Sequence, residues 1–342
     1  MKKRHVVYIC LLLLLVAGIY APPVLPVIQL PGEILFSWSK GSPLAGLFGE
    51  GFTNTFLAAL ITFVLLVLMA VGLKAKSRTV EEVPSGFYNF FEMMIEGAFG
   101  YVENAAGKWA KAFFPFFMTF ILWILLANWM ELIPGVDAVG KWENLPHHAV
   151  HKAEIAAEKE GKHLTEEEIH KIEEEAEGTG GIQNGIFLLK GDADEHGKDW
   201  TIVPFVRAAA TDLNFTLAIA IISVVMTQYY GMKAQGMKYW KKFFIWEADK
   251  IAKNPLAILD PIVGLLEFVS EIFKMVSFAF RLLGNIFAGQ VLLFVIASLI
   301  PIANILFWHL EFAVGALQAV VFALLTLTFM SSATQEHHGE EH

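Results

Sequence analysis

Five long runs of apolar residues are the main feature of this chain. A helix needs about 20 apolar residues to cross the roughly 30 Å of hydrocarbon in a bilayer. Four runs contain no charged residue, and the fifth contains a single arginine, Arg281. The runs cover residues 55–73, 112–130, 213–231, 275–300 and 312–335. The pattern therefore predicts an all-α fold, a polytopic membrane bundle of about five transmembrane helices.

A shorter apolar run, residues 6–20, lies near the N-terminus. It follows three basic residues at positions 2–4 and precedes the helix-breaking Pro22 and Pro23. This layout is typical of a signal peptide or a short signal anchor. Because the small-residue cleavage pattern is poor, cleavage stays open, and residues 1–21 are predicted to be a signal-like or anchor segment.

The basic residues predict the orientation of the bundle. They gather in two connections, residues 74–111 and residues 231–256. Cytoplasmic loops carry an excess of Lys and Arg, whereas long loops translocate largely regardless of charge. We therefore expect a multi-pass protein of the cell (inner) membrane, with the N-terminus extracytoplasmic after the signal-like segment and the C-terminus cytoplasmic. The long polar stretch at 137–200 then lies outside.

The polar stretch at 137–200 differs in composition from the rest of the chain. It is rich in Glu, Lys, Ala and His, and Thr165 followed by Glu168 has the spacing of a capping box at a helix start. We expect a solvated helix or helical hairpin rather than a hydrophobic core. Three clustered histidines lack a carboxylate or cysteine at a firm ligand spacing, so we expect no metal there. They are His147, His148 and His151.

Residues 84–104 follow the first apolar run and have an amphipathic pattern. Apolar side chains fall on one helical stripe, and Glu92, Glu96 and Glu103 lie elsewhere. Such a helix suits the membrane interface. An ordinary cytoplasmic helix packed on protein is an equally good interpretation.

Composition narrows the class of protein. The chain has 342 residues, a net charge of −9, 56% hydrophobic and 17% charged residues, and a mean hydropathy of +0.54. Soluble domains carry about 25% charged residues, so a soluble enzyme is disfavoured. The single cysteine, Cys10, excludes an internal disulfide and a cysteine-built metal site. We expect no cofactor, no metal and no nucleic-acid partner.

Arg281 belongs to a row of mostly polar residues within an apolar segment, which we name the polar seam. An ionisable group in hydrocarbon costs roughly 2.5–3.5 kcal/mol on insertion scales, so such residues are functional candidates. Steps of three and four place the seam residues on one helical face. They are Glu267, Glu271, Lys274, Phe278, Arg281, Asn285 and Ala288. The structural alternative is that Glu271 pairs with Lys274 and that Arg281 caps a buried network.

The chemistry of arginine indicates what Arg281 could do. An arginine guanidinium stays protonated in proteins, so it is poorly suited to relaying protons. A fixed positive charge lowers the pKa of a nearby carboxyl group. Arg281 could therefore attract a moving carboxylate and force it to release its proton.

Further polar residues could line a water-filled path. Glu311 and Gln318 are seven residues apart and share a face of the last helix, and Gly315 between them permits close packing. Asp212 lies near the outer end of the third apolar run, where the alternative role is a helix cap. The residues predicted to line this path are Asp212, Asn214, Glu267, Gln290 and Glu311.

Four motifs follow one another along the chain. They are FPF at 114–116 leading to AN at 127–128 and LIP at 132–134, ATDLN at 210–214, FRLLGNIFAG at 280–289, and EFAVGALQAVVF at 311–322. Together they extend over most of residues 52–335. In this order they closely resemble the motifs of the a subunit of the F-type ATP synthase membrane sector, the ATP synthase A chain family.

The resemblance implies a fold and a role. The fold has two long, tilted helices curved against a ring of c subunits, and two aqueous half-channels, one from each side. A proton would join a ring carboxylate, ride around, and leave when that carboxylate meets the essential arginine, which is Arg281 by motif position. Glu271 and Lys274 are further seam residues. The implied proton-pathway residues are Glu267, Asn285, Gln290, Glu311, Gln318, Asp212 and Asn214.

The resemblance also implies partners. They are the c-ring subunits, b-type peripheral stalk subunits, membrane lipid and protons, with sodium open as the alternative ion. The chain would be no enzyme by itself but the ion-translocating stator subunit of a rotary ATP synthase. The competing functions are a secondary transporter or ion channel that uses the same buried charges, and a structural membrane anchor. No internal repeat stands out, which counts against a transporter.

The chain departs from the family pattern in three places. Many relatives carry an acidic or basic residue nine positions after the arginine, where this chain has Gln290. Glu311 matches the family position that forms a polar pair with that residue, so a Gln290–Glu311 pair is expected. Lys274 and the 137–200 insertion have no clear counterpart.

These interpretations divide the chain into segments. The membrane core is predicted at 257–336, where two long helices translocate the ion. The other segments are the signal-like 1–21, the first two membrane helices at 22–136 with the interfacial helix 84–104, the extracytoplasmic insertion 137–200, the third membrane helix and cytoplasmic loop at 201–256, and the cytoplasmic tail 337–342.

Overall fold

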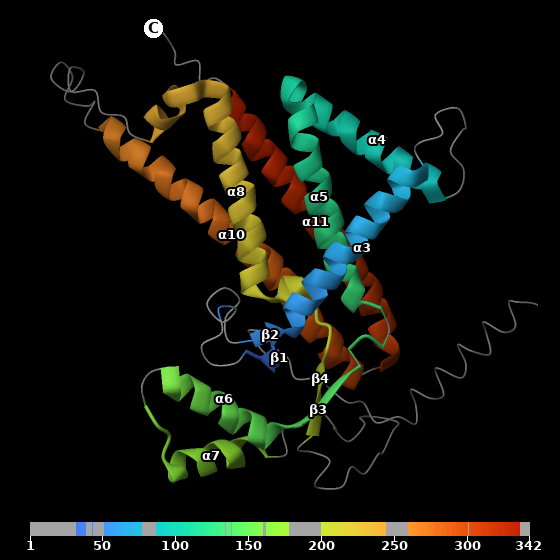
Figure 1. The fold of residues 1–342 in the computed structure, drawn as a ribbon, viewed down its shortest axis with the longest axis vertical. Coiled ribbons are helices and arrows are strands. Elements are labelled where there is room, and N and C mark those ends of the chain that lie inside the picture. The colour runs from blue at the N-terminus through green and yellow to red at the C-terminus, as the bar shows by residue number, and fades with distance from the viewer. Residues whose placement is uncertain are drawn as a thin grey trace, which may run out of the picture. The chain divides into compact units, whose positions relative to one another are not determined.

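Long helices make up most of the described chain (Figure 1). The computed structural model describes residues 32–38, 43, 51–76, 87–133, 135–137, 139–159, 162–177, 200–243, 259–299 and 301–335. The long helices are α3 (Asn54–Lys76), α4 (Phe87–Ala106), α5 (Ala110–Glu131), α8 (Leu213–Gln235), α10 (Leu259–Leu299) and α11 (Pro301–Thr334). The all-α prediction is therefore confirmed. The predicted signal-like segment 1–21 and the tail 337–342 lie outside the described residues.

Among the described residues, five helical stretches are long and apolar enough to cross a membrane, as the sequence predicts. They are Asn54–Lys74, Tyr88–Glu131, Leu213–Trp240, Pro261–Ala297 and Ala303–Thr334. The helices α10 and α11 have 41 and 34 residues. At 1.5 Å per residue each is longer than the roughly 30 Å of hydrocarbon, so each must tilt or extend beyond it.

The second of these stretches is really two helices. The 3₁₀ turn Gly107–Trp109 separates α4 from α5, and Gly107 has a positive φ of 52° that favours glycine. On α4, Met94, Ile95 and Ala98 pack against the buried core. This agrees with the interpretation that predicted a helix packed on protein. A second apolar stripe on α4, which includes Phe90 and Met93, stays exposed and is free to meet the membrane interface.

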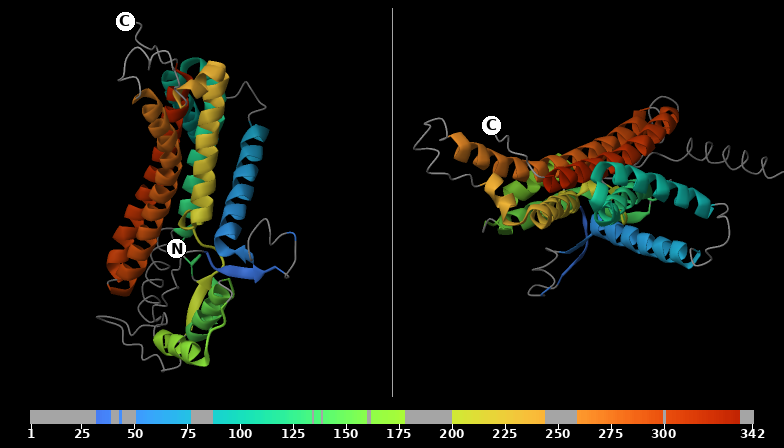
Figure 2. Two further views of the ribbon diagram at one scale, coloured as in Figure 1. Left: turned by 90° about the vertical axis from the view of Figure 1, so that its left-hand side faces the viewer. Right: turned by 90° about the horizontal axis from the view of Figure 1, so that it is seen from above.

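The chain divides into two compact units, and a hydrophobic core of side chains from five helices lies in the second. This unit comprises Ala58–Met130, Ala208–Ile286 and Ala313–His342. Within it the C-terminal part of α11 runs alongside α5 and α8 (Figure 2): Phe120 and Phe322 have ring centroids 5.3 Å apart, and the hydroxyls of Ser223 and Thr326 hydrogen-bond at 2.8 Å. Aromatic and aliphatic side chains from α4, α5, α8, α10 and α11 fill this core.

The first unit contains the polar insertion and two short antiparallel strand pairs. It comprises Met1–Leu57, Glu131–Arg207 and Phe287–Phe312. Strand β3 (Gly140–Asn144) pairs with β4 (Trp200–Pro204), and β1 (Ile34–Ser37) pairs with β2 (Gly51–Thr53). The sequence analysis did not predict these strands. They are three to five residues long, and the β3–β4 pair joins segments about 60 residues apart, so local patterns carry little signal.

The described part of the insertion contains a helical hairpin, in agreement with the prediction. Helix α6 (Leu145–Lys159) lies beside α7 (Glu166–Ala176), and none of the residues of α7 is buried (Figure 1). The predicted capping box is confirmed: Thr165 Oγ1 accepts from the Glu168 amide, and the Glu168 carboxylate accepts from the Thr165 amide at 2.9 Å. The Thr165 amide and hydroxyl both donate hydrogen bonds to the Glu168 carboxylate, and these two bonds lower the pKa of the Glu168 carboxyl.

Asp137 is a titratable group of the first unit outside the five stretches. Burial raises the pKa of its carboxyl from 3.8 to about 6, and the positive charge of the buried Arg207 opposes part of this rise. Burial disfavours the charged form. The contribution of Asp137 to the free energy of unfolding is therefore largest below pH 3.8, falls as the pH rises through about 6, and changes no further above that pH.

Replacing Asp137 with asparagine should remove this pH dependence. Relative to the parent, Asp137→Asn should gain stability between pH 4 and pH 7, by at most about 3 kcal/mol. Thermal unfolding of the purified protein at several pH values measures the difference. The matched control is Glu167→Gln, which alters an exposed carboxylate. The expectation would be contradicted if the difference in the free energy of unfolding between Asp137→Asn and the parent did not change with pH.

Candidate functional site on the two long helices

Arg281 lies on an outward-facing, apolar side of α10. Arg281 is exposed, and its guanidinium carbon lies 5.7 Å from the ring centroid of Phe278 on the same helix. The neighbouring Phe280 is 56% exposed, and a Cβ added to Gly284 would meet nothing within 4 Å. Within the described ranges, no carboxylate forms an ion pair with Arg281. The predicted alternative, in which Arg281 caps a buried network, is therefore not observed there.

The polar seam passes from the side of α10 that packs against other helices to the side that is exposed. Glu271 and Phe278 are buried, whereas Arg281, Asn285 and Ala288 are exposed. Steps of three and four average 3.5 residues per turn, and an α-helix has 3.6. A seam of three heptads therefore drifts by roughly 60° around the helix. This drift carries the seam from the packed side to the exposed side.

Glu271 and Lys274 form an ion pair at the packed end of the seam. Lys274 Nζ lies 2.8 Å from Glu271 Oε1, and Gln228 Nε2 of α8 donates to Glu271 Oε2 at 3.0 Å. The predicted structural alternative for these two seam residues is thus present. The sequence analysis missed Gln228, although a lone polar side chain within an apolar run could have indicated it.

Glu311 of α11 lies against Gly289 of α10 within the first unit. A Cβ built on Gly289 would overlap the Glu311 carboxyl group. Gln290 is 6% exposed, and its Oε1 accepts no hydrogen bond from the part of the chain that the structure describes. Its Nε2 donates none to the Glu311 carboxyl group either, so the expected hydrogen-bonded Gln290–Glu311 pair is not found between these two described residues. Gln290 follows Gly289 on α10, so its side chain is turned by about 100° around the helix axis. The Glu311 carboxyl group instead occupies the space that Gly289 leaves by having no side chain.

The remaining predicted residues lie in the second unit. Asp212 is buried and caps α8, because its side chain accepts from the Asn214 amide at 2.9 Å, so the alternative role as a helix cap is observed. The side chain of Asn214 is exposed, and Glu267 and Gln318 are half-buried. Gln290 and Glu311 belong to the first unit.

Gly315 brings α11 close to α5, as the sequence predicts. A Cβ on Gly315 would lie 3.2 Å from the Cβ of Asn128, and Asn128 Nδ2 donates to the Gly315 carbonyl at 3.4 Å. Asn128 is 4% exposed. The motif around Asn128 was recognised in the sequence, but its partner on α11 was not.

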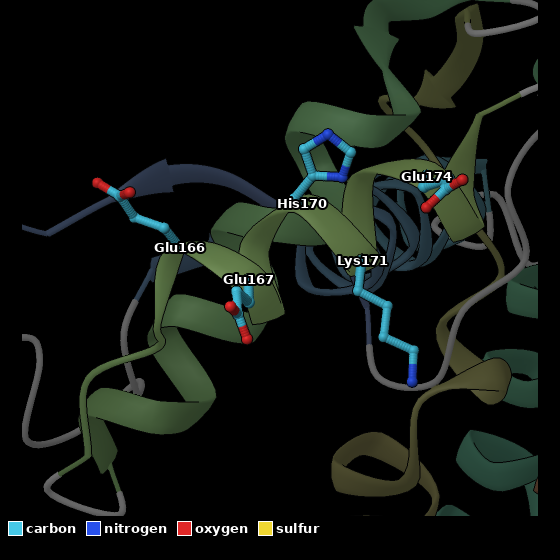
Figure 3. A pocket seen from close by; sticks show the side chains of 5 residues that line it. All are labelled: Glu166, Glu167, His170, Lys171 and Glu174. Atoms are coloured by element: carbon cyan, nitrogen blue, oxygen red, sulfur yellow. The ribbon is translucent and has the colours of Figure 1, made fainter.

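The insertion holds a shallow pocket whose lining is unlike a ligand site. Five side chains of α7 line it, and Figure 3 shows them projecting in different directions from one helix. They are Glu166, Glu167, His170, Lys171 and Glu174. In the portion of the chain with described coordinates, no group of three or more His, Cys, Asp or Glu residues could hold a metal ion.

Comparison with known proteins covers most of the chain. The model of the family "ATP synthase A chain" matches residues 55–331. ATP synthase subunit a of Mycobacterium ulcerans (strain Agy99) is 28% identical over 294 residues, which are 84% of this chain and 90% of the relative. The subunit a of Marinomonas sp. (strain MWYL1) is 26% identical over 278 residues, 77% of each chain. That of Campylobacter jejuni subsp. jejuni serotype O:6 is 35% identical over 140 residues, 40% of this chain and 58% of the relative.

The matched region includes all five stretches that could cross a membrane, apart from their outermost residues. It also contains the exposed arginine of α10 and the glutamate of α11 described above. The chain is a multi-pass membrane protein and belongs to the ATP synthase A chain family, whose members form part of the membrane sector of ATP synthase.

Proposed function

We propose that this chain is the stator subunit that transfers protons to and from the carboxylates of a c-ring and so couples ion flow to rotation. The observation that carries the proposal is Arg281, an exposed cation without a carboxylate partner among the described residues, on an apolar helix face. A lone charge in hydrocarbon costs roughly 2.5–3.5 kcal/mol or more. A carboxylate supplied by a neighbouring chain would remove this cost.

The permanence of the arginine charge fits this role. When a protonated ring carboxyl approaches Arg281, the guanidinium lowers its pKa and the proton leaves. The resulting carboxylate pairs with Arg281 and avoids being an unpaired ion in a medium of low dielectric. The same charge repels protons and blocks a direct leak between the two half-channels. One elementary charge moving through 100 mV releases about 2.3 kcal/mol, which becomes rotation only if the leak is prevented.

Two aqueous half-channels would lead to the ring, and polar residues of α8, α10 and α11 would line them. We assign Glu311 a titrating role because its carboxyl group reaches α10 at Gly289. Gln290 is a buried lining residue whose Oε1 accepts no hydrogen bond from the described residues, and a water molecule in the half-channel would supply one. Asp212 both caps α8 and lines the path. The further lining residues of the proposal are Asn214, Glu267, Asn285 and Gln318.

The proposal includes partners and orientation. The partners are the c-ring, b-type peripheral stalk subunits, lipid and protons, with sodium as the alternative ion. The insertion and the N-terminus after the signal-like segment lie outside, and the C-terminus lies in the cytoplasm. The deciding experiment compares ATP synthesis driven by an imposed proton gradient in membranes with the parent chain and with Arg281→Ala. Undiminished synthesis by an assembled variant would refute the proposal.

Gly289 should be needed to hold the Glu311 carboxyl group in place. In Gly289→Ala the new methyl group overlaps the carboxyl group at the flexible end of the Glu311 side chain, so the carboxyl group must move away from this position. We expect passive proton flux through the membrane sector, with the soluble head removed, to fall at least about fivefold. The matched control is Gly72→Ala on α3, where the methyl group meets nothing within 4 Å. Equal flux in both variants would show that Gly289 has no positioning role.

A further inference from the structure

A row of hydrogen bonds in the second unit ends at Lys274, and the proposed function leaves it unexplained. The Tyr239 hydroxyl donates to Gln228 Oε1 at 2.7 Å. Gln228 Nε2 donates to Glu271 Oε2 at 3.0 Å, and Lys274 Nζ donates to Glu271 Oε1 at 2.8 Å. Tyr239 is 1% exposed and Glu271 is 8% exposed. We name these four residues the Lys274 network.

Both oxygens of the Glu271 carboxylate have a partner. One accepts a hydrogen bond from the Lys274 ammonium and the other accepts from the Gln228 amide. The ion pair places the negative charge of Glu271 directly beside the positive charge of Lys274. Glu271 is therefore well placed to neutralise Lys274.

Two stacked rings separate Lys274 from Arg281. Lys274 Nζ lies 4.6 Å from the ring centroid of Phe329 of α11. The Phe329 ring stacks on Phe278 with centroids 5.6 Å apart and an angle of 24° between the planes. The guanidinium of Arg281 lies 5.7 Å from the Phe278 centroid. The two cations thus lie at opposite ends of an aromatic pair, where ring faces attract each of them.

We propose that Glu271 is a positioning residue that holds Lys274 away from the ring-facing surface, so that the ring carboxylate meets Arg281 and not Lys274. The inference rests on the proposed function. Lys274 lies seven residues before Arg281, which is about 10 Å along the helix. Its ammonium has a flexible four-carbon stem and three donors, so when released it can pair with a carboxylate.

A released Lys274 would trap the ring carboxylate. The released ammonium of Lys274 would lie about 10 Å from the point where the ring carboxylate meets Arg281. At an effective dielectric of about 20, a unit charge at that distance changes the fraction of time the carboxylate spends there about tenfold. In Glu271→Gln the amide keeps the shape of the side chain and loses the charge. We expect gradient-driven ATP synthesis to fall about tenfold while the subunit still copurifies with its ring.

The deciding variant is Glu271→Gln combined with Lys274→Gln. If Glu271 acts only by neutralising Lys274, the double variant should regain synthesis to within about threefold of the parent. If Glu271 carries protons, or if it serves only to join α8 to α10, the double variant should be as poor as Glu271→Gln or poorer. Either of those results overturns the inference. The matched control is Glu103→Gln, an exposed acid on α4.

Two additions keep the test decisive. If Glu271→Gln fails to assemble, Glu271→Asp takes its place, because aspartate keeps the charge and lengthens the ion pair with Lys274. Glu271→Asp should lose less ATP synthesis than Glu271→Gln. Adding Lys274→Gln should again restore the lost synthesis. If adding Lys274→Gln to Glu271→Asp reduces ATP synthesis further, the inference is also overturned. Arg281→Ala is measured beside these variants. If Arg281→Ala retains ATP synthesis, the proposed function is refuted. If Arg281→Ala loses synthesis but the double variant does not regain it, only the role of Glu271 is refuted.

Discussion

Replacing Arg281 with alanine is expected to abolish ATP synthesis driven by a proton gradient while the complex still assembles. Without the guanidinium, the ring carboxylate has no cationic partner at the contact. An uncompensated buried charge costs about 3–5 kcal/mol, which corresponds to a loss of roughly hundredfold or more in rate. Arg281→Gln should be as inactive, because glutamine supplies hydrogen bonds and no charge. Assembly should survive because Arg281 makes no ion pair within the described part of the chain.

The measurement is ATP synthesis after an acid–base jump, together with passive proton flux once the soluble head is removed. Loss of the repelling charge should increase the passive flux in Arg281→Ala. The matched control is Lys111→Ala, which removes another exposed cation from a candidate span. Arg281→Lys keeps a charge but not the planar fork, and it should retain little activity. Coupled synthesis in an assembled Arg281→Ala complex would contradict the proposed function.

Replacing Glu311 with glutamine is expected to slow proton flux without creating a leak. The amide preserves the shape of the side chain against Gly289, but it cannot take up and release a proton. A positioned acid or base typically contributes a hundredfold or more, so a fall of at least about tenfold is expected for one step of a relay. Glu311→Asp keeps a titratable group that no longer reaches Gly289 fully, and its flux should be intermediate.

Passive flux through the head-depleted membrane sector separates this effect from the arginine effect. Loss of Arg281 should raise the flux, whereas loss of Glu311 should lower it. Glu103→Gln on α4 is the matched control, because Glu103 is an exposed acid remote in sequence from the proposed path. Unchanged flux in Glu311→Gln would remove Glu311 from the proposed path.

Several local features were predictable because they depend on neighbours in the sequence. The apolar runs indicated the five spans, and the Thr165–Glu168 spacing indicated the capping box. Gly315 indicated a close approach, since only a missing side chain allows one. The strand pairs were missed, as were the hydrogen bonds from Gln228 to Glu271 and from Tyr239 to Gln228. Their partners are far apart in the chain, and periodicity carries no information on them.

The sequence by itself determined that this is a polytopic helical membrane protein with one arginine inside an apolar run and within a family-specific motif, because apolar run length and motif order are properties of a linear chain. Tertiary structure alone decided which side of each helix is packed. It turned Glu271 inward to Lys274 and left Arg281 exposed, and it placed Glu311 against Gly289 instead of Gln290. The reason is geometric: a helical row drifts by about 20° per heptad, and only the neighbouring helices determine where along the row burial ends.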